Sequence, residues 1–307
     1  MKNIISASRR TDIPAFYADW FTNRLKAGFV YVKNPYSGKV SHVSLKPSVL
    51  HSTLFCSKNY FPLIRKIKDV EKVTRNLFFH FTITGMPRNL ELSTPETNEA
   101  VKDFKWLSRR YSPRQVVWRF DPITITDKLY FEYFEESFIK TAGQLKGYSN
   151  QCYMSFVSPY NKTIKNFKKY TDQTLIDITP ENKKLFAERL SELAEGFGFR
   201  LYSCCNDALL SGKINKGQCI NGAVLAEIFD DFDVNLKPTP TRDGCGCTKA
   251  VDIGSYDSCP HGCVYCYANT DKEKALAFQR NHNPEWNGLG FNVDEITAEK
   301  GGQTSLF

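Results

Sequence analysis

The chain has 307 residues, of which 41% are hydrophobic and 24% are charged, a composition typical of a globular protein with one large core. No apolar run approaches the roughly 20 residues of a membrane-spanning helix, and the N-terminal residues lack the apolar stretch of a signal peptide. We therefore expect a cytoplasmic protein without a membrane partner. The formal net charge of +8 would suit an anionic partner, and a small-molecule substrate is favoured over a nucleic acid because no dedicated nucleic-acid module is evident.

Short apolar segments rich in β-forming residues alternate with segments of helical periodicity. The predicted helices cover residues 14–27, 97–111, 128–145 and 180–197, and the last begins with a Thr179 N-cap followed by proline. Residues 39–45 predict an additional short strand or hairpin. The predicted strands are residues 4–8, 29–32, 52–56, 77–81, 116–119, 152–156, 199–203 and 251–254.

Strands that alternate with helices predict a parallel sheet with helices on its faces, and eight such units predict an α/β fold, a (β/α) barrel that is complete or nearly so. We expect residues 1–258 to form the barrel body and residues 259–282 to add a loop and helix to the same domain, with the helix over residues 271–279. Residues 283–307 are expected to form a C-terminal tail, either a covering strap or a partly mobile end.

Eight of the ten cysteines fall between positions 204 and 266, and such clustering indicates metal binding. Cys259, Cys263 and Cys266 have the spacing C-x3-C-x2-C, so their thiolates could hold three corners of a 4Fe-4S cube and leave the fourth iron open to a small molecule. A zinc knuckle completed by His261 is the alternative. That histidine lies between two thiol ligands, an awkward position from which to close a tetrahedron.

A second cysteine set consists of Cys204, Cys219, Cys245 and Cys247, which come from separate segments that could meet at one end of the barrel. Four thiolates leave no open coordination position, and we expect a second 4Fe-4S cluster, with structural zinc as the alternative. Cys205 is left out because, in a continuing strand, it would point away from Cys204.

Polar residues at the carboxyl ends of the predicted strands are candidates for the active site, because (β/α) barrels assemble their sites there. The cationic side chains of Arg10, Lys33 and Arg119 would suit a carboxylate or phosphate. Lys33 and Arg119, with the neighbouring Asn34 and Asp121, form the candidate substrate-binding set.

Three further side chains have less specific expectations. Asp12, just before Ile13-Pro14, is expected either to cap the first helix or to touch substrate. His42 and His80 stand alone among apolar neighbours and are expected to be satisfied rim or core histidines.

The cysteine loop resembles the cluster loop of radical S-adenosylmethionine (SAM) enzymes in its spacing, in Tyr265 before the last cysteine, and in the following Tyr267-Ala268. The resemblance implies that SAM binds the open iron and that Tyr265 lies against its adenine. It also implies an electron donor such as flavodoxin or ferredoxin, whose electron cleaves SAM to a 5′-deoxyadenosyl radical that abstracts hydrogen from substrate.

In radical SAM enzymes this loop follows the first barrel strand, whereas here it follows the last predicted strand. A circular permutation gives the same arrangement and would place the N-terminal strand beside the strand that precedes the loop. That position ordinarily carries a Gly-Gly-Glu-like motif, and here it carries S-A-S-R-R-T-D at residues 6–12. Ser8 and Arg10 are therefore the candidate SAM-binding residues of this segment.

The whole pattern is similar to the family of domain of unknown function 1848, for which the resemblance implies a radical-SAM-like loop and no assigned reaction. On these grounds we predict a radical SAM enzyme whose substrate is unknown and could be anionic. The alternative is a non-catalytic iron–sulfur or zinc-stabilised barrel that binds a small ligand or nucleic acid. The matching segments are residues 6–14, 33–36, 81–85, 118–122 and 252–256.

Overall fold

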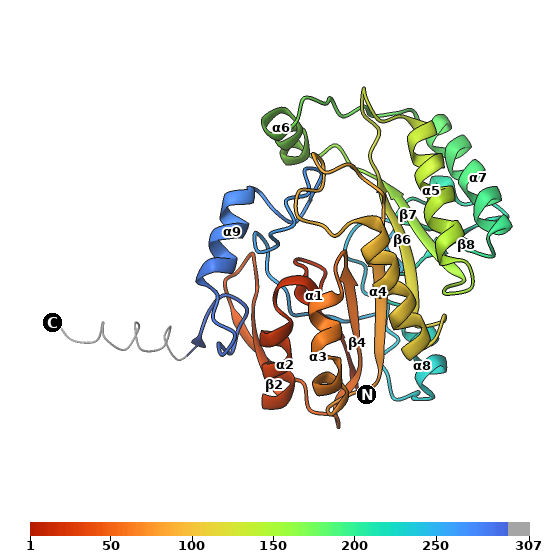
Figure 1. Ribbon diagram of the computed structural model, residues 1–307. Coiled ribbons are helices and arrows are strands. Elements are labelled where there is room, and N and C mark those ends of the chain that lie inside the picture. Colours follow the sequence, from red (N-terminus) through yellow and green to blue (C-terminus); the bar gives the residue numbers. More distant parts are fainter. Residues whose placement is uncertain (294–307) are drawn as a thin grey trace.

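The computed structural model describes residues 1–293, and its centre is one eight-stranded sheet with helices packed against it (Figure 1). All neighbouring strands in this sheet are parallel, in the order β10-β1-β4-β5-β6-β7-β8-β9. The predicted α/β class with a parallel sheet is therefore confirmed. The strands are β1 (Asn3–Ser6), β4 (Leu50–Ser57), β5 (Leu77–Thr82), β6 (Val116–Ile123), β7 (Gln151–Phe156), β8 (Arg200–Cys204), β9 (Ile214–Gly217) and β10 (Val251–Asp252).

The sheet is open, so the complete form of the predicted barrel, which was expected to be complete or nearly so, is wrong. Within residues 1–293, β9 and β10 stand at opposite ends of the strand order and do not pair with each other. Closure requires that the first and last strands share a ladder, and the two residues of β10 pair only with Ile5 and Ser6 of β1. The expectation that the N-terminal strand lies beside the strand preceding the cysteine loop is confirmed by the same pairing.

One predicted strand lies outside the main sheet. β2 (Phe29–Lys33) pairs antiparallel with β3 (Val40–Ser44) in a separate hairpin, so residues 29–32 are not a barrel strand. The eighth strand of the sheet is instead β9, which sequence reasoning missed. His42 lies in this hairpin and stacks on Phe29 with ring centroids 5.3 Å apart.

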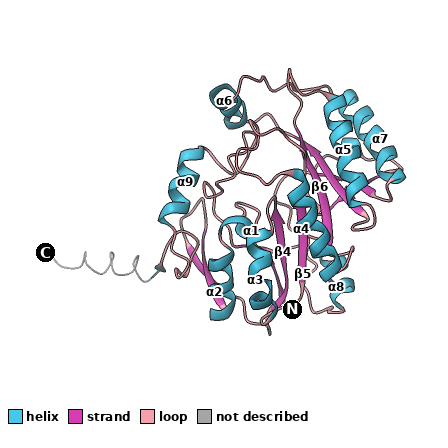
Figure 2. Ribbon diagram, in the orientation of Figure 1, coloured by secondary structure: helices cyan, strands magenta, loops and turns pink. Residues whose placement is uncertain are grey.

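Most helices cover one face of the sheet (Figure 2). Large buried side chains fill the space between them and the strands, including Trp20, Phe55, Phe79, Trp118 and Phe138. The predicted N-cap of the longest helix is confirmed, since the Asn182 amide donates to Thr179 Oγ1 at 3.2 Å. The helices are α1 (Ile13–Phe16), α2 (Ala18–Ala27), α3 (Phe61–Glu71), α4 (Thr97–Arg110), α5 (Phe131–Leu145), α6 (Asn161–Tyr170), α7 (Pro180–Gly196), α8 (Gly222–Phe229) and α9 (Lys272–Asn281), with a 3-10 turn η1 (Asp207–Leu209).

The other face of the sheet divides into an apolar half and a polar half. Near the amino ends of the strands, α8 and the chain around it pack on a second apolar cluster that includes Leu54, Phe78, Val117 and Tyr153. Side chains two positions further along each strand share that face. They are Cys56, His80, Arg119 and Ser155.

His80 belongs to this polar layer and is buried, as expected of a core histidine. Its Nε2 lies 2.7 Å from the carbonyl oxygen of Cys219, and burial lowers its pKa to about 4. Nε2 therefore donates while the ring is neutral. Nδ1 is then a buried acceptor with no hydrogen-bond partner among the described residues, so the histidine is only half satisfied.

After α9, residues 283–293 cover α2 and β2, as a strap would. The indole of Trp20 donates to the Trp286 carbonyl at 2.9 Å, and the Tyr31 amide donates to the Asn287 carbonyl at 2.8 Å. Residues 294–307 of the predicted tail lie outside the described residues. Among residues 1–293, no helix combines the length and apolar character needed to cross a bilayer.

Candidate functional site

The cysteine loop follows the carboxyl end of β10, and two side-chain hydrogen bonds hold the backbone at its start. The Tyr17 hydroxyl donates to the Ser258 carbonyl at 2.5 Å, and the Asn269 side-chain amide donates to the Cys259 carbonyl at 2.6 Å. Gly262 has φ +69°, and a Cβ there would lie 3.2 Å from the Leu92 side chain, so glycine serves both the turn and the packing. The protein's own contacts therefore hold the loop in place.

A second segment, between β5 and α4, clasps the loop from the other side. The Ser93 amide donates to the His261 carbonyl at 2.9 Å, and the Val264 amide donates to the Leu90 carbonyl at 3.0 Å. Glu91 and Cys263 form an antiparallel bridge between these two bonds. The loop is thus paired along its backbone with a segment distant in the sequence.

His261 is fully engaged in this framework and is only 2% exposed. Its Nε2 lies 2.8 Å from Asp12 Oδ2, and its Nδ1 lies 3.1 Å from the Ser93 carbonyl oxygen. Both ring nitrogens therefore face oxygen acceptors, which disfavours His261 as a fourth metal ligand. Asp12 also accepts from the Ala15 amide at 3.1 Å, which confirms the expected helix cap, and from Ser57 Oγ at 2.7 Å.

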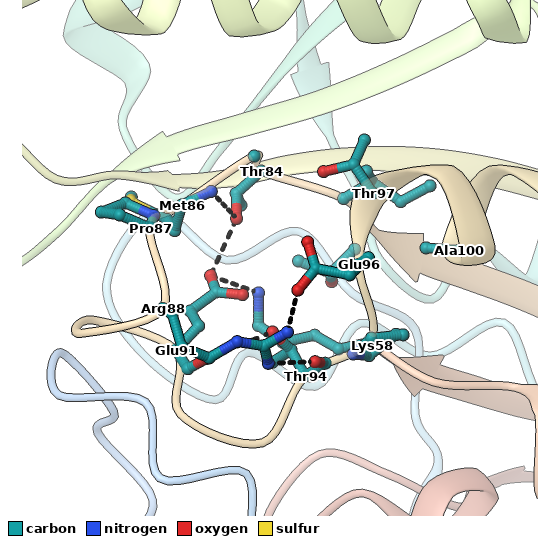
Figure 3. A pocket seen from close by; sticks show the side chains of 14 residues that line it. Lys58, Thr84, Met86, Pro87, Arg88, Glu91, Thr94, Glu96, Thr97 and Ala100 are labelled. Carbon is teal, nitrogen blue, oxygen red and sulfur yellow. Dashed lines mark hydrogen bonds and ion pairs between the residues drawn. The ribbon is translucent and has the colours of Figure 1, made fainter.

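Tyr265 points into a buried charged network. Its hydroxyl donates to Glu91 Oε1, the same oxygen that accepts from Lys58 Nζ at 2.9 Å and from Thr84 Oγ1 at 2.8 Å. Figure 3 shows Lys58, Thr84 and Glu91 converging at a cavity of about 140 Å³. Lys58 directly follows the last residue of β4. Glu91 was missed because it lies in a loop, where no strand-end or motif signal marked it.

The network is charged in the folded protein. Burial acts to lower the pKa of Lys58, but Glu91 and Cys263 raise it above its ordinary value. Burial acts to raise the pKa of Glu91, but Lys58 and Tyr265 hold it below its ordinary value. A paired charge therefore sits within contact of the cysteine loop.

Cys259, Cys263 and Cys266 are close enough to influence one another electrostatically, and burial raises the pKa of each thiol. All ten cysteines of the chain are free. Within residues 1–293, no three or more His, Cys, Asp or Glu side chains are grouped as the ligands of a metal ion. The predicted 4Fe-4S site therefore stays a prediction.

Three buried oxygen atoms beside the loop have no hydrogen-bond partner among the described residues. They are the hydroxyls of Ser8 and Thr11, just after β1, and the side-chain carbonyl of Asn269. Unpaired buried oxygens of this kind are uncommon in native folds. They suit a polar ligand bound at the carboxyl end of β1, the position where Ser8 was predicted to bind SAM.

The predicted substrate residues separate into two groups. The guanidinium of Arg119 is paired with Asp121, which also accepts from the Ser155 hydroxyl. The same guanidinium lies 3.5 Å from Cys219 Sγ. Lys33 and Asn34 instead line a cavity of about 400 Å³ together with Arg10. The structure does not bring Arg119 and Asp121 into that cavity.

The second cysteine set converges in part. Cys204 Sγ lies 3.4 Å from Cys219 Sγ and 3.7 Å from Cys205 Sγ. The side chain of Cys247 interacts with those of both Cys219 and Cys245. The premise for leaving out Cys205, that its side chain points away from Cys204, is wrong, because β8 ends at Cys204 and Cys205 has φ +55°.

The fold and the loop together define an α/β protein with a cysteine-rich loop at the carboxyl end of an edge strand of a parallel sheet. Residues 4–268 match the family described as Domain of unknown function (DUF1848), and the chain belongs to that family, as its motifs predicted. The matched span includes all ten cysteines. Neither the comparison with curated proteins nor the comparison with solved structures gave a match.

Proposed function

We propose that the protein is a radical SAM-type iron–sulfur enzyme. The observation that carries the proposal is a loop with three half-buried cysteines and an internal histidine that is held by Asp12 and Ser93. With His261 engaged, the loop itself offers three ligands, the number that leaves one iron of a 4Fe-4S cube open. The unpaired oxygens of Ser8, Thr11 and Asn269 fit a polar cofactor beside that cube.

When bound, the cluster would pass one electron from a donor such as flavodoxin or ferredoxin to SAM, and the C–S cleavage would give methionine and a 5′-deoxyadenosyl radical that takes hydrogen from substrate. The chain's own residues position and shield this chemistry. Cys259, Cys263 and Cys266 would hold the cluster. Glu91 and Lys58 fix the Tyr265 side chain, so the backbone that would face adenine is rigid.

The second cysteine set would hold a separate metal with no role in SAM binding. We propose a 4Fe-4S cluster or a zinc ion there. Four thiolates on one ion at about 2.3 Å would lie about 3.8 Å apart, and the contacts of Cys204 with Cys205 and Cys219 are close to that spacing.

Anaerobic reconstitution tests the enzyme proposal. The native chain should bind iron and sulfide, turn brown, and release 5′-deoxyadenosine from SAM when reduced with dithionite. Cys263→Ala should lose this activity by at least about 100-fold, since a two-cysteine loop cannot hold the cluster. Cys152→Ala, which removes a buried thiol outside both cysteine groups, is the matched control and should keep it. A colourless protein that holds zinc at the loop and leaves SAM intact would favour a non-catalytic metal-stapled fold.

A further inference from the structure

We propose that the cavity of about 400 Å³ beside the cysteine loop binds a small organic anion, the substrate of the proposed enzyme. That the anion is a substrate rests on the proposed function. Anion binding itself can be measured whether or not the protein is a radical SAM enzyme. The cavity lies between the hairpin β2-β3 and the carboxyl ends of β1 and β10. We call it the hairpin cavity.

The hairpin cavity carries an excess of positive charge. Arg9, Arg10 and Lys33 line it against one carboxylate, Asp252. That carboxylate is already used, because Asp252 Oδ1 accepts from Arg10 Nε at 2.6 Å and Oδ2 accepts from the Arg9 amide at 3.2 Å. Among residues 1–293, no hydrogen-bond or ion-pair partner neutralises the Arg9 guanidinium or the Lys33 ammonium, so two cations remain available to an anion.

The remaining walls suit a flat or apolar group. Tyr36 and Tyr256 stand at the cavity with Val32, Val43 and Val251. Tyr36 is 89% exposed, and its side chain interacts with that of Tyr256. A pocket of a few hundred Å³ with apolar walls and a few convergent polar groups is typical of small-molecule sites, which have volumes of roughly 300–1,000 Å³.

The hairpin cavity is joined directly to the cysteine loop. The hydroxyl of Tyr267, the residue after Cys266, donates to the Arg9 carbonyl at 2.6 Å. The Gly254 amide, on the chain that leads from β10 into the loop, donates to Asp252 Oδ1 at 3.0 Å. A ligand in the cavity would therefore lie next to the backbone that carries the last thiol.

The charge distinguishes a substrate from SAM. SAM carries an ammonium and a sulfonium against one carboxylate, so two unpaired cations in the hairpin cavity would repel it overall. The unpaired oxygens of Ser8, Thr11 and Asn269 suit SAM's ammonium better. We therefore assign Arg10, which is paired with Asp252, to the anion site and not to SAM.

Calorimetric titration of the full chain tests the site with ring-bearing anions and their uncharged counterparts: AMP against adenosine, phenyl phosphate against phenol, and benzoate against benzyl alcohol. At least one anion should bind saturably and at least about 10-fold more tightly than its counterpart. Comparison of the two phosphates with benzoate shows which anionic group the cavity prefers. Binding should weaken at high salt, since the contact is electrostatic.

Variants connect the binding to the hairpin cavity. Arg9→Gln combined with Lys33→Gln should lower the affinity for the bound anion at least about 10-fold. Lys39→Gln, at an exposed lysine of the same hairpin that does not line the cavity, should leave it unchanged. Failure of all three anions to bind, equal affinity for the charged and uncharged members of every pair, or a double variant that binds as well as the native chain would overturn the proposal. Tighter binding of a short RNA than of every small anion would also overturn it.

The two proposals fail in different ways. Anion binding with no formation of 5′-deoxyadenosine would retain the site and reject the radical SAM proposal. Formation of 5′-deoxyadenosine without anion binding would do the reverse.

Discussion

Asp12 connects more of the site than any other single side chain. Its carboxylate accepts from the Ala15 and Lys58 amides, from the Ser57 hydroxyl at 2.7 Å and from His261 at 2.8 Å. One buried carboxylate thus ties α1, the end of β4 and the cysteine loop together. The geometry of the loop depends on a residue at the opposite end of the chain.

Replacing Asp12 should therefore destabilise the whole fold. Asp12→Ala should lower the free energy of unfolding by about 3 kcal/mol, because it leaves a buried partner and several donors unpaired. Urea denaturation measures the loss. A double-mutant cycle with His261→Ala should show a coupling of about 1 kcal/mol or more. Additive effects would show that the contact between the two side chains contributes nothing.

The exposed Asp19 on α2 provides the control. It pairs with Lys66 while its side chain is 62% exposed. Surface ion pairs contribute little, so Asp19→Ala should cost less than about 1 kcal/mol.

The sequence identified many residues of the site but not how they are grouped. The cysteine spacing marked the loop, strand-end positions marked Arg10 and Lys33, and the resemblance to the radical SAM loop marked Ser8. Glu91 could not be found this way, because its role depends on a loop folding back over Cys263. Arg119 lies at the end of a predicted strand, as expected of a candidate site residue. Its pairing with Asp121 depends on the tertiary structure, which no local sequence pattern encodes.

At the scale of elements, α3 and α4 are linked by a partly buried ion pair. Glu71, the last residue of α3, accepts from Arg110 Nε at 2.8 Å and from the Tyr111 hydroxyl at 2.8 Å. The hydrogen bonds from Arg110, opposed by burial and assisted by Tyr111, lower the pKa of Glu71 below its ordinary value of 4.5. The folded state therefore favours the ionised carboxylate.

This contact should make part of the stability depend on pH. A lowered carboxyl pKa adds stability above about pH 4.5, and the stability is lost as the pH falls through the folded-state pKa. Glu71→Gln should be less stable than the native chain by about 1–2 kcal/mol at pH 7, and the difference should shrink below pH 4.5. Thermal unfolding from pH 3 to pH 7 measures this. Glu99→Gln, at an exposed pair on α4, is the control; a gap that is constant across this range would contradict the account.

Elements with strong local signals were predicted well, and those whose placement depends on partners were not. The cap at Thr179 and the periodicity of α4 and α7 are local. The β-rich residues 29–33 form a strand, but β propensity does not determine which strand pairs with it. β9, with the sequence Ile-Asn-Lys-Gly, is too short and polar to carry a strand pattern and is ordered by its pairing with β8.

At the scale of the molecule, the chain between β9 and β10 joins the two open edges of the sheet. Residues 218–250 contain α8, part of the second apolar cluster, and Cys219, Cys245 and Cys247. Their metal, if bound, would fasten this segment to Cys204 at the end of β8.

Replacing Cys245 and Cys247 together by serine should therefore lower the metal content by one cluster or one zinc ion and destabilise the C-terminal region, because metal-binding free energy becomes folding free energy. Iron and zinc analysis with hydrogen exchange measures both effects. Cys263→Ala is the reciprocal control and should remove only the metal of the loop. Full iron and zinc content in the double variant would show that these cysteines are not ligands.

The position of β1 between β10 and β4 has a consequence for biosynthesis. On the ribosome β1 emerges before its partner β10, which is made only after the other strands of the sheet. Until β10 is made, one edge of β1 therefore has no partner in the nascent chain and could pair with a wrong strand. Asp12 and Glu91 are also made before the cysteines that they hold in place. Any cell that loads this loop must therefore deliver its metal to a chain in which all the strands of the sheet have already been made.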